Sequence, residues 1–277
     1  MSLKNIVTTP LKLGASAPFK LLHISDTHLA FADERDDERK RKLAEGRYRS
    51  FAHAEEYFAD ELALAKKENA LLCHTGDLID FVSAANLDRA KKFADENDCF
   101  FVAGNHEFSL YVGEAFEDEA YREQSLAKVQ ACFRNDIRFS SRIVNGVNLV
   151  GIDDGYYRFD RPQLDALKQE AGRGLPILLF MHNPLYEQKL FEHCMTRASS
   201  AYLTAAPDEL ITGYDDYRYR QQKADDLTKE AFACIRSEPL IKAVFTGHLH
   251  YDWEGMVTDT LPQYVTGIGT ARLITVE

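Results

Sequence analysis

Two histidines stand in the segment "VFTGHLHYDW" near the end of this chain, at a spacing that would let both imidazoles reach one centre. An apolar run over residues 244–246 breaks at Gly247, and His248 and His250 follow with one residue between them. Imidazole is the commonest side-chain ligand of protein-bound metals, so the pair suggests part of a metal site. A polar loop that happens to contain histidines would look the same. The remaining ligands must therefore come from elsewhere in the chain.

Four other apolar runs also end in side chains that can bind metal ions. "HISDTH" contains Asp26 and His28, "HTGDLID" contains Asp77 and Asp80, "VAGNHE" contains Asn105 and His106, and "FMHNP" contains His182. In α/β sheets, functional side chains gather beyond the carboxyl ends of parallel strands. A single motif of this kind is weak evidence. Five in series, each after an apolar run, predict that all of them line one crevice.

The types of these side chains indicate which metals they would bind. The set consists of carboxylates, imidazoles and one amide oxygen, with no thiolate. Such donors favour Mn, Fe or Zn over a soft metal or an all-oxygen Mg²⁺ site. There are too many donors for one tetrahedral ion, so we expect two ions, divalent or of mixed valence. Two ions about 3.5–4 Å apart form a clamp for in-line displacement at phosphorus and activate bound water. One carboxylate should bridge them.

Alternating strands and helices must position these motifs. Strand-like runs cover residues 19–26, 70–77, 99–107, 176–183 and 241–248, and helical spacing covers residues 48–69, 84–97, 116–133 and 161–172. This alternation predicts parallel strands joined by crossover helices. A hairpin with Asn145-Gly146 as its turn and three short strands at the C-terminus predict a second sheet. We therefore expect an α/β fold of two packed sheets with helices outside.

Two segments carry weaker signals. Residues 1–18, with two prolines and a glycine, are expected to form a loose lead-in. Residues 33–50 mix acidic and basic side chains densely, which is typical of a solvated surface.

Composition limits the classes of function. The chain has 277 residues, and 33 basic against 44 acidic side chains give a net charge of −11. Such a surface repels phosphate backbones and anionic membranes, which argues against long nucleic acids and lipid surfaces as partners. The five cysteines form no C-x-x-C pair, and no run approaches the roughly 18 apolar residues of a membrane span. We expect a soluble, cytoplasmic protein.

The motifs D-x-H, G-D-x-x-D, G-N-H-E, a lone strand-end H and G-H-x-H, in this order, resemble those of the calcineurin-like metallophosphoesterase superfamily. The resemblance extends from about residue 19 to the C-terminus. It includes "FDRPQLDALKQE", which is similar to the helix that follows the strand-end aspartate, here Asp153. It implies a four-layer α/β/β/α sandwich with a dinuclear centre, formed by a single domain over residues 1–277.

The resemblance also assigns roles to individual residues. The first metal would be held by Asp26, His28 and His250, the second by Asn105, His182 and His248, and Asp77 would bridge the two. His106 would be a catalytic residue close to the phosphate, steadying the transition-state charge or protonating the leaving oxygen. Asp80 would orient the His106 ring and raise its pKa. Glu107 is expected to make structural contacts near the site.

The implied reaction is hydrolysis of a phosphomonoester or phosphodiester by a metal-activated hydroxide, with a small molecule or nucleotide as substrate. Phosphoprotein phosphatases of the superfamily have D-R-G where residues 80–82 read D-F-V, and an arginine where this chain has Ala103. Those differences disfavour a phosphoprotein phosphatase, and the net charge disfavours a nuclease. A scaffold protein that has lost the chemistry is a further alternative, although every ligand position is filled.

An insertion at about residues 185–222 is rich in aromatic and basic side chains. It contains Tyr202, Tyr214, Tyr217, Tyr219, Arg218 and Arg220. As a cap over the site, its tyrosines would stack on a base or sugar and an arginine would replace the missing phosphate contacts. The alternative is an accessory helix pair that packs on the core.

Overall fold

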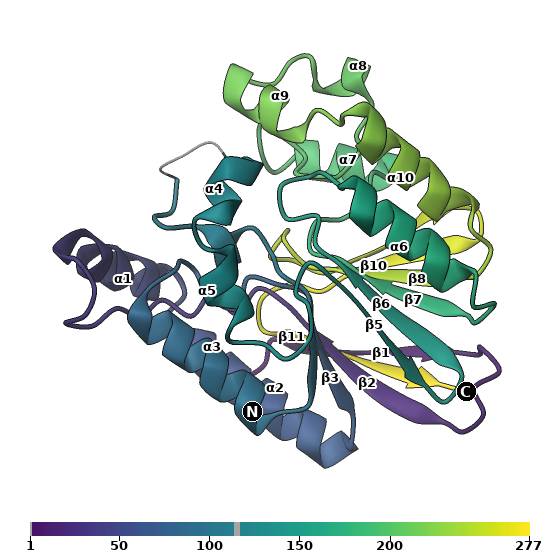
Figure 1. Ribbon diagram of the computed structural model, residues 1–277, viewed down its shortest axis with the longest axis horizontal. Coiled ribbons are helices and arrows are strands. Elements are labelled where there is room, and N and C mark those ends of the chain that lie inside the picture. Colours follow the sequence, from purple (N-terminus) through teal and green to yellow (C-terminus); the bar gives the residue numbers. More distant parts are fainter. Residues whose placement is uncertain (1, 114–116) are drawn as a thin grey trace.

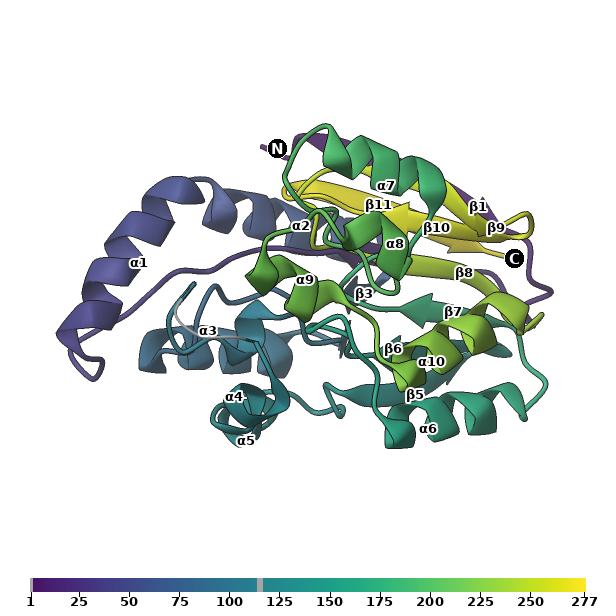
Figure 2. The ribbon, with the colours of Figure 1, turned by 90° about the horizontal axis from the view of Figure 1, so that it is seen from above.

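The computed structural model describes residues 2–113 and 117–277 as two β-sheets packed face to face between two layers of helices (Figures 1 and 2). The first sheet has the strand order β1-β11-β2-β3-β4 and the second has the order β5-β6-β7-β8-β10-β9. The first sheet is formed by β1 (Asn5–Leu11), β11 (Thr270–Val276), β2 (Phe19–Ile24), β3 (Leu71–His74) and β4 (Cys99–Phe101). The second is formed by β5 (Phe139–Val144), β6 (Val147–Ile152), β7 (Ile177–Phe180), β8 (Ile241–Thr246), β10 (Leu261–Val265) and β9 (Trp253–Thr258).

Helices cover the outer face of each sheet (Figure 1). On the first sheet lie α2 (Ala54–Glu68) and α3 (Ala84–Glu96), and on the second lie α6 (Arg161–Ala171) and α10 (Asp226–Ser237). The remaining helices are α1 (Glu38–Ser50), the 3-10 turn η1 (His106–Phe108), α4 (Glu119–Glu123), α5 (Leu126–Gln130), α7 (Gln188–Met195), α8 (Asp208–Ile211) and α9 (Asp216–Gln222).

The period-two alternation of buried strands produces the four layers. In β2, Leu21 contributes to the core between the two sheets, whereas Leu22 packs beneath α2 and α3. In β7, Leu178 faces the inter-sheet core and Leu179 the core beneath α6 and α10. Successive side chains of a strand point to opposite faces, so strands that are apolar on both faces must be covered on both. The predicted four-layer α/β/β/α fold is confirmed.

Parallel pairing brings the carboxyl ends of the central strands to one edge. β2, β3 and β4 run parallel in the first sheet, and β6, β7 and β8 run parallel in the second. The loops that follow these strands are bonded between the two sheets: the backbone N–H of His248 donates to the Asp26 carboxylate at 2.8 Å, and Nδ1 of His182 donates to Thr75 O at 2.7 Å. The strand-end motifs of both sheets therefore meet in one place.

The N-terminal segment differs from the prediction. Residues 5–11 are not a loose lead-in but an edge strand, β1, that pairs in parallel with β11 from Asn5↔Thr270 to Leu11↔Val276. Pro10 obscured this strand in the sequence, because proline lacks the N–H of a central strand; at an edge it is tolerated.

Two predicted helices are interrupted. The helix expected at residues 48–69 is divided, since α1 ends at Ser50 and α2 begins at Ala54. Phe51, in the turn between them, has non-helical backbone angles and lies flat against the ring of His28. In the stretch expected at residues 116–133, residue 116 lies outside the described residues, and the rest forms the short helices α4 and α5. The Asn145-Gly146 hairpin turn is confirmed, with φ of 48° and 83°.

The described helices include none with the length and apolar character needed to cross a lipid bilayer.

Candidate metal centre

Five of the predicted ligands have backbones in the left-handed region. The φ angles are 56° for Asp26, 52° for His28, 56° for Asp77, 68° for His248 and 61° for His250. Non-glycine residues rarely adopt this conformation, which costs about 1–3 kcal/mol per residue. It occurs here in residues of three different strand-end loops. The surrounding contacts therefore hold the backbone in a strained form that aims these side chains at one point.

Glycines allow the loops to approach this closely. A Cβ at Gly104 would overlap the carboxylate and backbone of Asp77, and one at Gly247 would overlap the side chains of Ser25 and Asp26. Any larger residue at either position would separate the loops.

The carboxylate of Glu107 ties two of the loops together. It accepts hydrogen bonds from the backbone N–H groups of Asp77 (2.7 Å), Leu78 (2.8 Å), Ile79 (3.2 Å) and Gly104 (2.7 Å). Burial, and then the charge of Asp77, raise the pKa of Glu107 to about 7. Glu107 thus makes structural contacts around the site, with its oxygens occupied by backbone donors.

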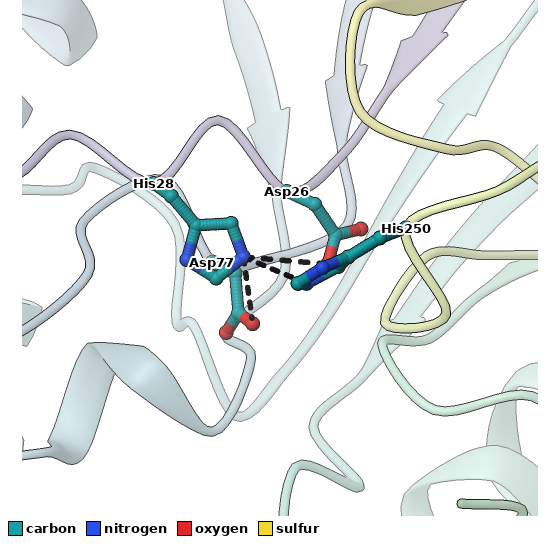
Figure 3. A group of neighbouring side chains, drawn as sticks. All are labelled: Asp26, His28, Asp77 and His250. Carbon is teal, nitrogen blue, oxygen red and sulfur yellow. Dashed lines mark hydrogen bonds and ion pairs between the residues drawn. The ribbon is translucent and has the colours of Figure 1, made fainter. Parts of the chain in front are cut away.

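Three groups of side chains that could hold a metal ion result within the described residues; one consists of His28, Asp80 and His106, and the other two share Asp77. In the first of these two groups, ligand atoms of Asp26, His28, Asp77 and His250 lie within 4.8 Å of one another. Figure 3 shows these four side chains pointing toward one another. In the second group, ligand atoms of Asp77, His182 and His248 also lie within 4.8 Å of one another. The two groups that share Asp77 bring together six of the seven predicted ligands around one central carboxylate.

Hydrogen bonds fix which ring nitrogen faces the centre. His182 donates from Nδ1 to the carbonyl oxygen of Thr75 (2.7 Å), and Nδ1 of His28 lies 2.8 Å from a carboxylate oxygen of Asp80. Their Nε2 atoms are left for a ligand, as is usual when a second partner orients a metal-binding histidine. At His248 the order is reversed: Nε2 lies 2.7 Å from the hydroxyl of Tyr157, and Nδ1 faces His182.

The separations between donor atoms fit a bound ion. Nε2 of His28 lies 3.0 Å from Nε2 of His250, and Nδ1 of His248 lies 3.1 Å from Nε2 of His182. Two nitrogens that bind one tetrahedral zinc ion, each at about 2.0–2.1 Å, are separated by about 3.3 Å. The histidine pairs, which are hydrogen-bonded in the metal-free protein, are therefore slightly closer than neighbouring ligands of a shared cation.

Buried oxygens without partners support the same fit. Oδ1 of Asp26 and Oδ1 of Asn105 are buried, and neither has a hydrogen-bond partner within the described residues. Buried polar atoms almost always have partners, so each such exception calls for an explanation such as a missing ion. Asn105 is the seventh predicted ligand. Its amide nitrogen donates to Glu117 (3.3 Å), which leaves the orphaned oxygen as the atom that a metal could bind.

The charges of the metal-free protein compensate one another. Burial alone would lower the pKa of His28 and His182, but hydrogen bonds to and charges of the neighbouring carboxylates raise both to about 10. Burial alone would raise the pKa of Asp26 and Asp77, yet the histidines around them hold both below the usual range. Burial prevails at His250, whose pKa falls to about 4. Two imidazolium ions therefore occupy the ligand set near neutral pH.

His106 and Asp80 lie beside this centre. Nδ1 of His106 donates to the backbone carbonyl of Asp80 (2.7 Å) and lies 3.3 Å from its carboxylate. That carboxylate is engaged more closely elsewhere: Arg47 binds it in a fork through Nε (2.6 Å) and Nη2 (2.8 Å), and His28 binds it at 2.8 Å. Asp80 therefore orients two histidines, and Arg47 orients Asp80.

Sequence reasoning missed Arg47 and Tyr157. Arg47 sits in the mixed-charge stretch that was interpreted as solvated surface, but its side chain is only 25% exposed. The sequence gives one signal for Arg47: Phe51 follows it by four residues and so lies on the same helical face. In the structure, the Arg47 guanidinium lies 4.9 Å from the ring centre of Phe51. Tyr157 carried no signal, since its hydroxyl meets His248 across 91 residues.

A cavity of about 450 Å³ opens over the site. It is lined by Asp77, Asn105, His106, His248 and His250 on the metal side, and by residues of the insertion on the other. Of the insertion residues singled out by sequence, Tyr202, Tyr217 and Arg218 line the cavity. Tyr214, Tyr219 and Arg220 do not; Tyr214 is buried beneath the loop and binds the backbone N–H of Ala201.

Comparison with known families agrees with this geometry. Residues 19–252 match the model of the calcineurin-like phosphoesterases. The chain belongs to this family. A calcineurin-like phosphoesterase is a metal-dependent hydrolase, and the shared Asp/His groups fit that type of centre. A comparison with curated protein sequences gives no match.

The chain is similar to several solved structures at low sequence identity, and the first of these shows the same fold. A dimetal phosphatase from Danio rerio is 14% identical, with a TM-score of 0.51 over 90% of this chain and 88% of that one. A putative 5′-nucleotidase from Staphylococcus aureus is 13% identical, with a TM-score of 0.44 over 94% of this chain and 51% of that one. A protein from Thermus thermophilus is 11% identical, with a TM-score of 0.49 over 91% of each chain.

Arg47→Met should weaken the centre, because it removes the fork that fixes Asp80 and, through it, His28. We expect metal affinity to fall about 10–100-fold and the free energy of unfolding to fall by about 1–3 kcal/mol. Arg47→Lys should restore part of both. Arg49→Met, an exposed site on the same helix, is the matched control. Calorimetry and thermal melts measure the two quantities; equal results for Arg47→Met and Arg49→Met would contradict the assigned role.

Metal uptake by the metal-free protein should release protons. His28 and His182, with pKa values raised from 6.5 to about 10, must lose their protons before they bind a cation. At pH 7.5 we expect about two protons per chain filled with Mn²⁺, measured by calorimetry in buffers of different ionisation enthalpy.

The same pKa shifts determine whether the metal-free fold gains or loses stability as the pH rises. Protonation of these histidines stabilises the metal-free fold fully below pH 6.5, and this contribution is lost as the pH rises through about 10. The melting temperature of the metal-free protein should therefore fall over this range more steeply than that of the loaded protein. Parallel curves, or no proton release, would show that the histidines are already neutral.

Proposed function

We propose that the chain hydrolyses phosphoesters of small molecules or nucleotides, with two metal ions held around Asp77. The observation that carries this proposal is that two groups of donor atoms share the Asp77 carboxylate at one side of the cavity. The proposed ligands are Asp26, His28 and His250 for the first ion and Asn105, His182 and His248 for the second, with Asp77 between them. Mn, Fe and Zn suit these imidazole and oxygen donors.

When bound, two such ions hold the phosphoryl oxygens and lower the pKa of bound water. The residues of the chain supply the charge and the orientation of the ligands. Fully buried Asp26 and Asp77 supply fixed negative charge at the ligand side. The hydrogen bonds to Thr75 and Asp80 keep His182 and His28 in one orientation, so the donors need no rearrangement before they bind.

His106 is the proposed proton donor to the leaving oxygen. A carbonyl oxygen can only accept, so the bond to Asp80 O places a hydrogen on Nδ1 of His106. Nε2 is then the ring atom left for the substrate, and it donates when the ring carries both protons. The Asp80 carboxylate also lies 3.3 Å from Nδ1 and helps to hold the ring in this orientation. As the bond between phosphorus and the leaving oxygen breaks, the Nε2 proton passes to that oxygen.

We propose further that the insertion at about residues 185–222 caps the site of a single-domain enzyme. Its Tyr202 ring lies 5.9 Å from the ring of His248, and its Gln221 donates to Glu117, another residue of the cavity wall, at 2.8 Å. The insertion thereby contacts two residues of the cavity wall that lie outside it in the sequence. A cap over a 450 Å³ cavity favours small substrates over protein or duplex substrates.

The buried neighbours of the motifs support this substrate class. Phe81, where phosphoprotein phosphatases have an arginine, is fully buried, and so is Ala103. Neither position can offer a charged group to a phosphate. The net charge of −11 disfavours polyanionic nucleic acids. All five cysteines are free, which agrees with the proposed cytoplasmic location.

The test compares hydrolysis of p-nitrophenyl phosphate and its bis-ester by metal-stripped protein reloaded with Mn²⁺. Asp77→Asn should reduce both activities to background. His106→Gln should keep its metals and lose about 10²–10⁴-fold in kcat, whereas the exposed His53→Gln should act like wild type. Faster monoester cleavage would indicate a phosphatase and faster diester cleavage a phosphodiesterase. Wild-type rates equal to those of Asp77→Asn on both substrates would refute the proposal.

A further inference from the structure

Two arginines on the insertion side of the cavity have no acidic partner. Arg197 and Arg218 line the cavity, and neither forms an ion pair with a carboxylate in the described part of the chain. Other arginines of this acidic protein do pair with acids, among them Arg142 with Asp98 at 2.7 Å. Both arginines face the cavity of a chain whose net charge is −11. They produce a positive region that faces the cavity.

Arg218 is held in place with most of its donors unused. Its Nη1 donates to Gln221 (2.8 Å), and its guanidinium lies 4.9 Å from the ring centre of Tyr202 and 5.1 Å from that of Tyr217. Gln221 is itself fixed by its bond to Glu117. The other guanidinium nitrogens have no protein acceptor among residues 2–113 and 117–277. An arginine ordered before binding loses less entropy when it captures an anion.

Arg197 and Ser200 form the neighbouring part of the wall. The Arg197 guanidinium lies 4.4 Å from the ring centre of Tyr251, whose hydroxyl contacts Cys194. Ser200 also lines the cavity and is fully buried, yet its hydroxyl has no hydrogen-bond partner in the described residues. A buried hydroxyl without a partner is costly, and an oxyanion in the cavity would accept a hydrogen bond from it. This orphaned group is independent of the two positive charges and indicates the same kind of ligand.

The positive wall adjoins the metal ligands through its aromatic rings. Tyr202, against which Arg218 lies, is 5.9 Å from His248 ring to ring, and Tyr251, against which Arg197 lies, follows His250 in the chain. A phosphoester held at the metal side would therefore extend its alcohol portion along this wall. The inference rests on the proposed function for that orientation.

We infer that the cavity selects phosphoesters whose alcohol portion carries a second oxyanion, a carboxylate or a further phosphate, bound by Arg218, Arg197 and Ser200. The ordered guanidinium of Arg218 supplies paired N–H donors, Arg197 adds charge, and Ser200 donates one hydrogen bond. This contact acts on the part of the substrate that leaves, whereas the phosphate under attack is held by the metal centre. The insertion thus determines which phosphoesters bind.

The test uses two matched pairs of substrates. Phenyl phosphate is compared with 4-carboxyphenyl phosphate, and adenosine 5′-phosphate with adenosine 3′,5′-bisphosphate. Within each pair the second oxyanion should lower KM, and Arg218→Met should raise KM of the doubly anionic member about 10–100-fold with little change in kcat. KM of the singly anionic member should change less than threefold. Dividing the change in KM that Arg218→Met causes for one member of a pair by the change for the other removes the different reactivities of their leaving groups.

Arg220→Met is the matched control, because Arg220 lies on the same helix and does not line the cavity. Ser200→Ala should give a smaller change in the same direction as Arg218→Met.

If Arg218→Met raises KM of both members of each pair equally, the arginine binds the phosphate under attack and the inference is wrong. If neither pair shows a preference in wild type, it is also wrong, while activity on phenyl phosphate would leave the proposed function intact. If the wild-type protein hydrolyses none of these substrates faster than Asp77→Asn does, the proposed function is refuted instead.

Discussion

The structure around the site depends on the position of one carboxylate, that of Asp77. Its Oδ1 accepts the backbone N–H of His106 at 2.9 Å, and its Oδ2 lies 3.2 Å from His182 and 3.7 Å from His28. Those residues come from both sheets, so a single side chain connects the two halves of the sandwich. Two of the three groups of side chains that could hold a metal ion in the described part of the chain include it. A displacement of Asp77 would therefore disorganise the whole centre.

Much of the surrounding structure keeps Asp77 there. Glu107 binds its backbone N–H, and Gly104 leaves room for its carboxylate. Five residues in left-handed backbone conformations would each cost about 1–3 kcal/mol, and such strain persists only where neighbouring contacts determine the conformation. A bound cation would add attraction among donors that, without it, depend on protons at His28 and His182 for charge balance. The site is thus organised before metal binding and stabilised further by it.

The sequence predicted the fold and the gathering of strand-end residues because both follow from short motifs beside apolar runs. Prediction from the sequence failed where a feature depends on contacts between residues that are far apart in the chain. Residues 5–11 form a strand only because β11, more than 260 residues later, offers an edge. Arg47 is one charge among many until the fold brings it to Asp80. Arg197 carried no signal at all, because the shape of the insertion alone decides which of its arginines face the cavity.

Crystals of the protein grown with Mn²⁺, measured at the manganese absorption edge, would test the central claim most directly. The account predicts two anomalous peaks about 3.5–4 Å apart, with the Asp77 carboxylate between them and Asn105 Oδ1 and Asp26 Oδ1 each bound to one. A single peak, or two peaks that Asp77 does not join, would contradict it.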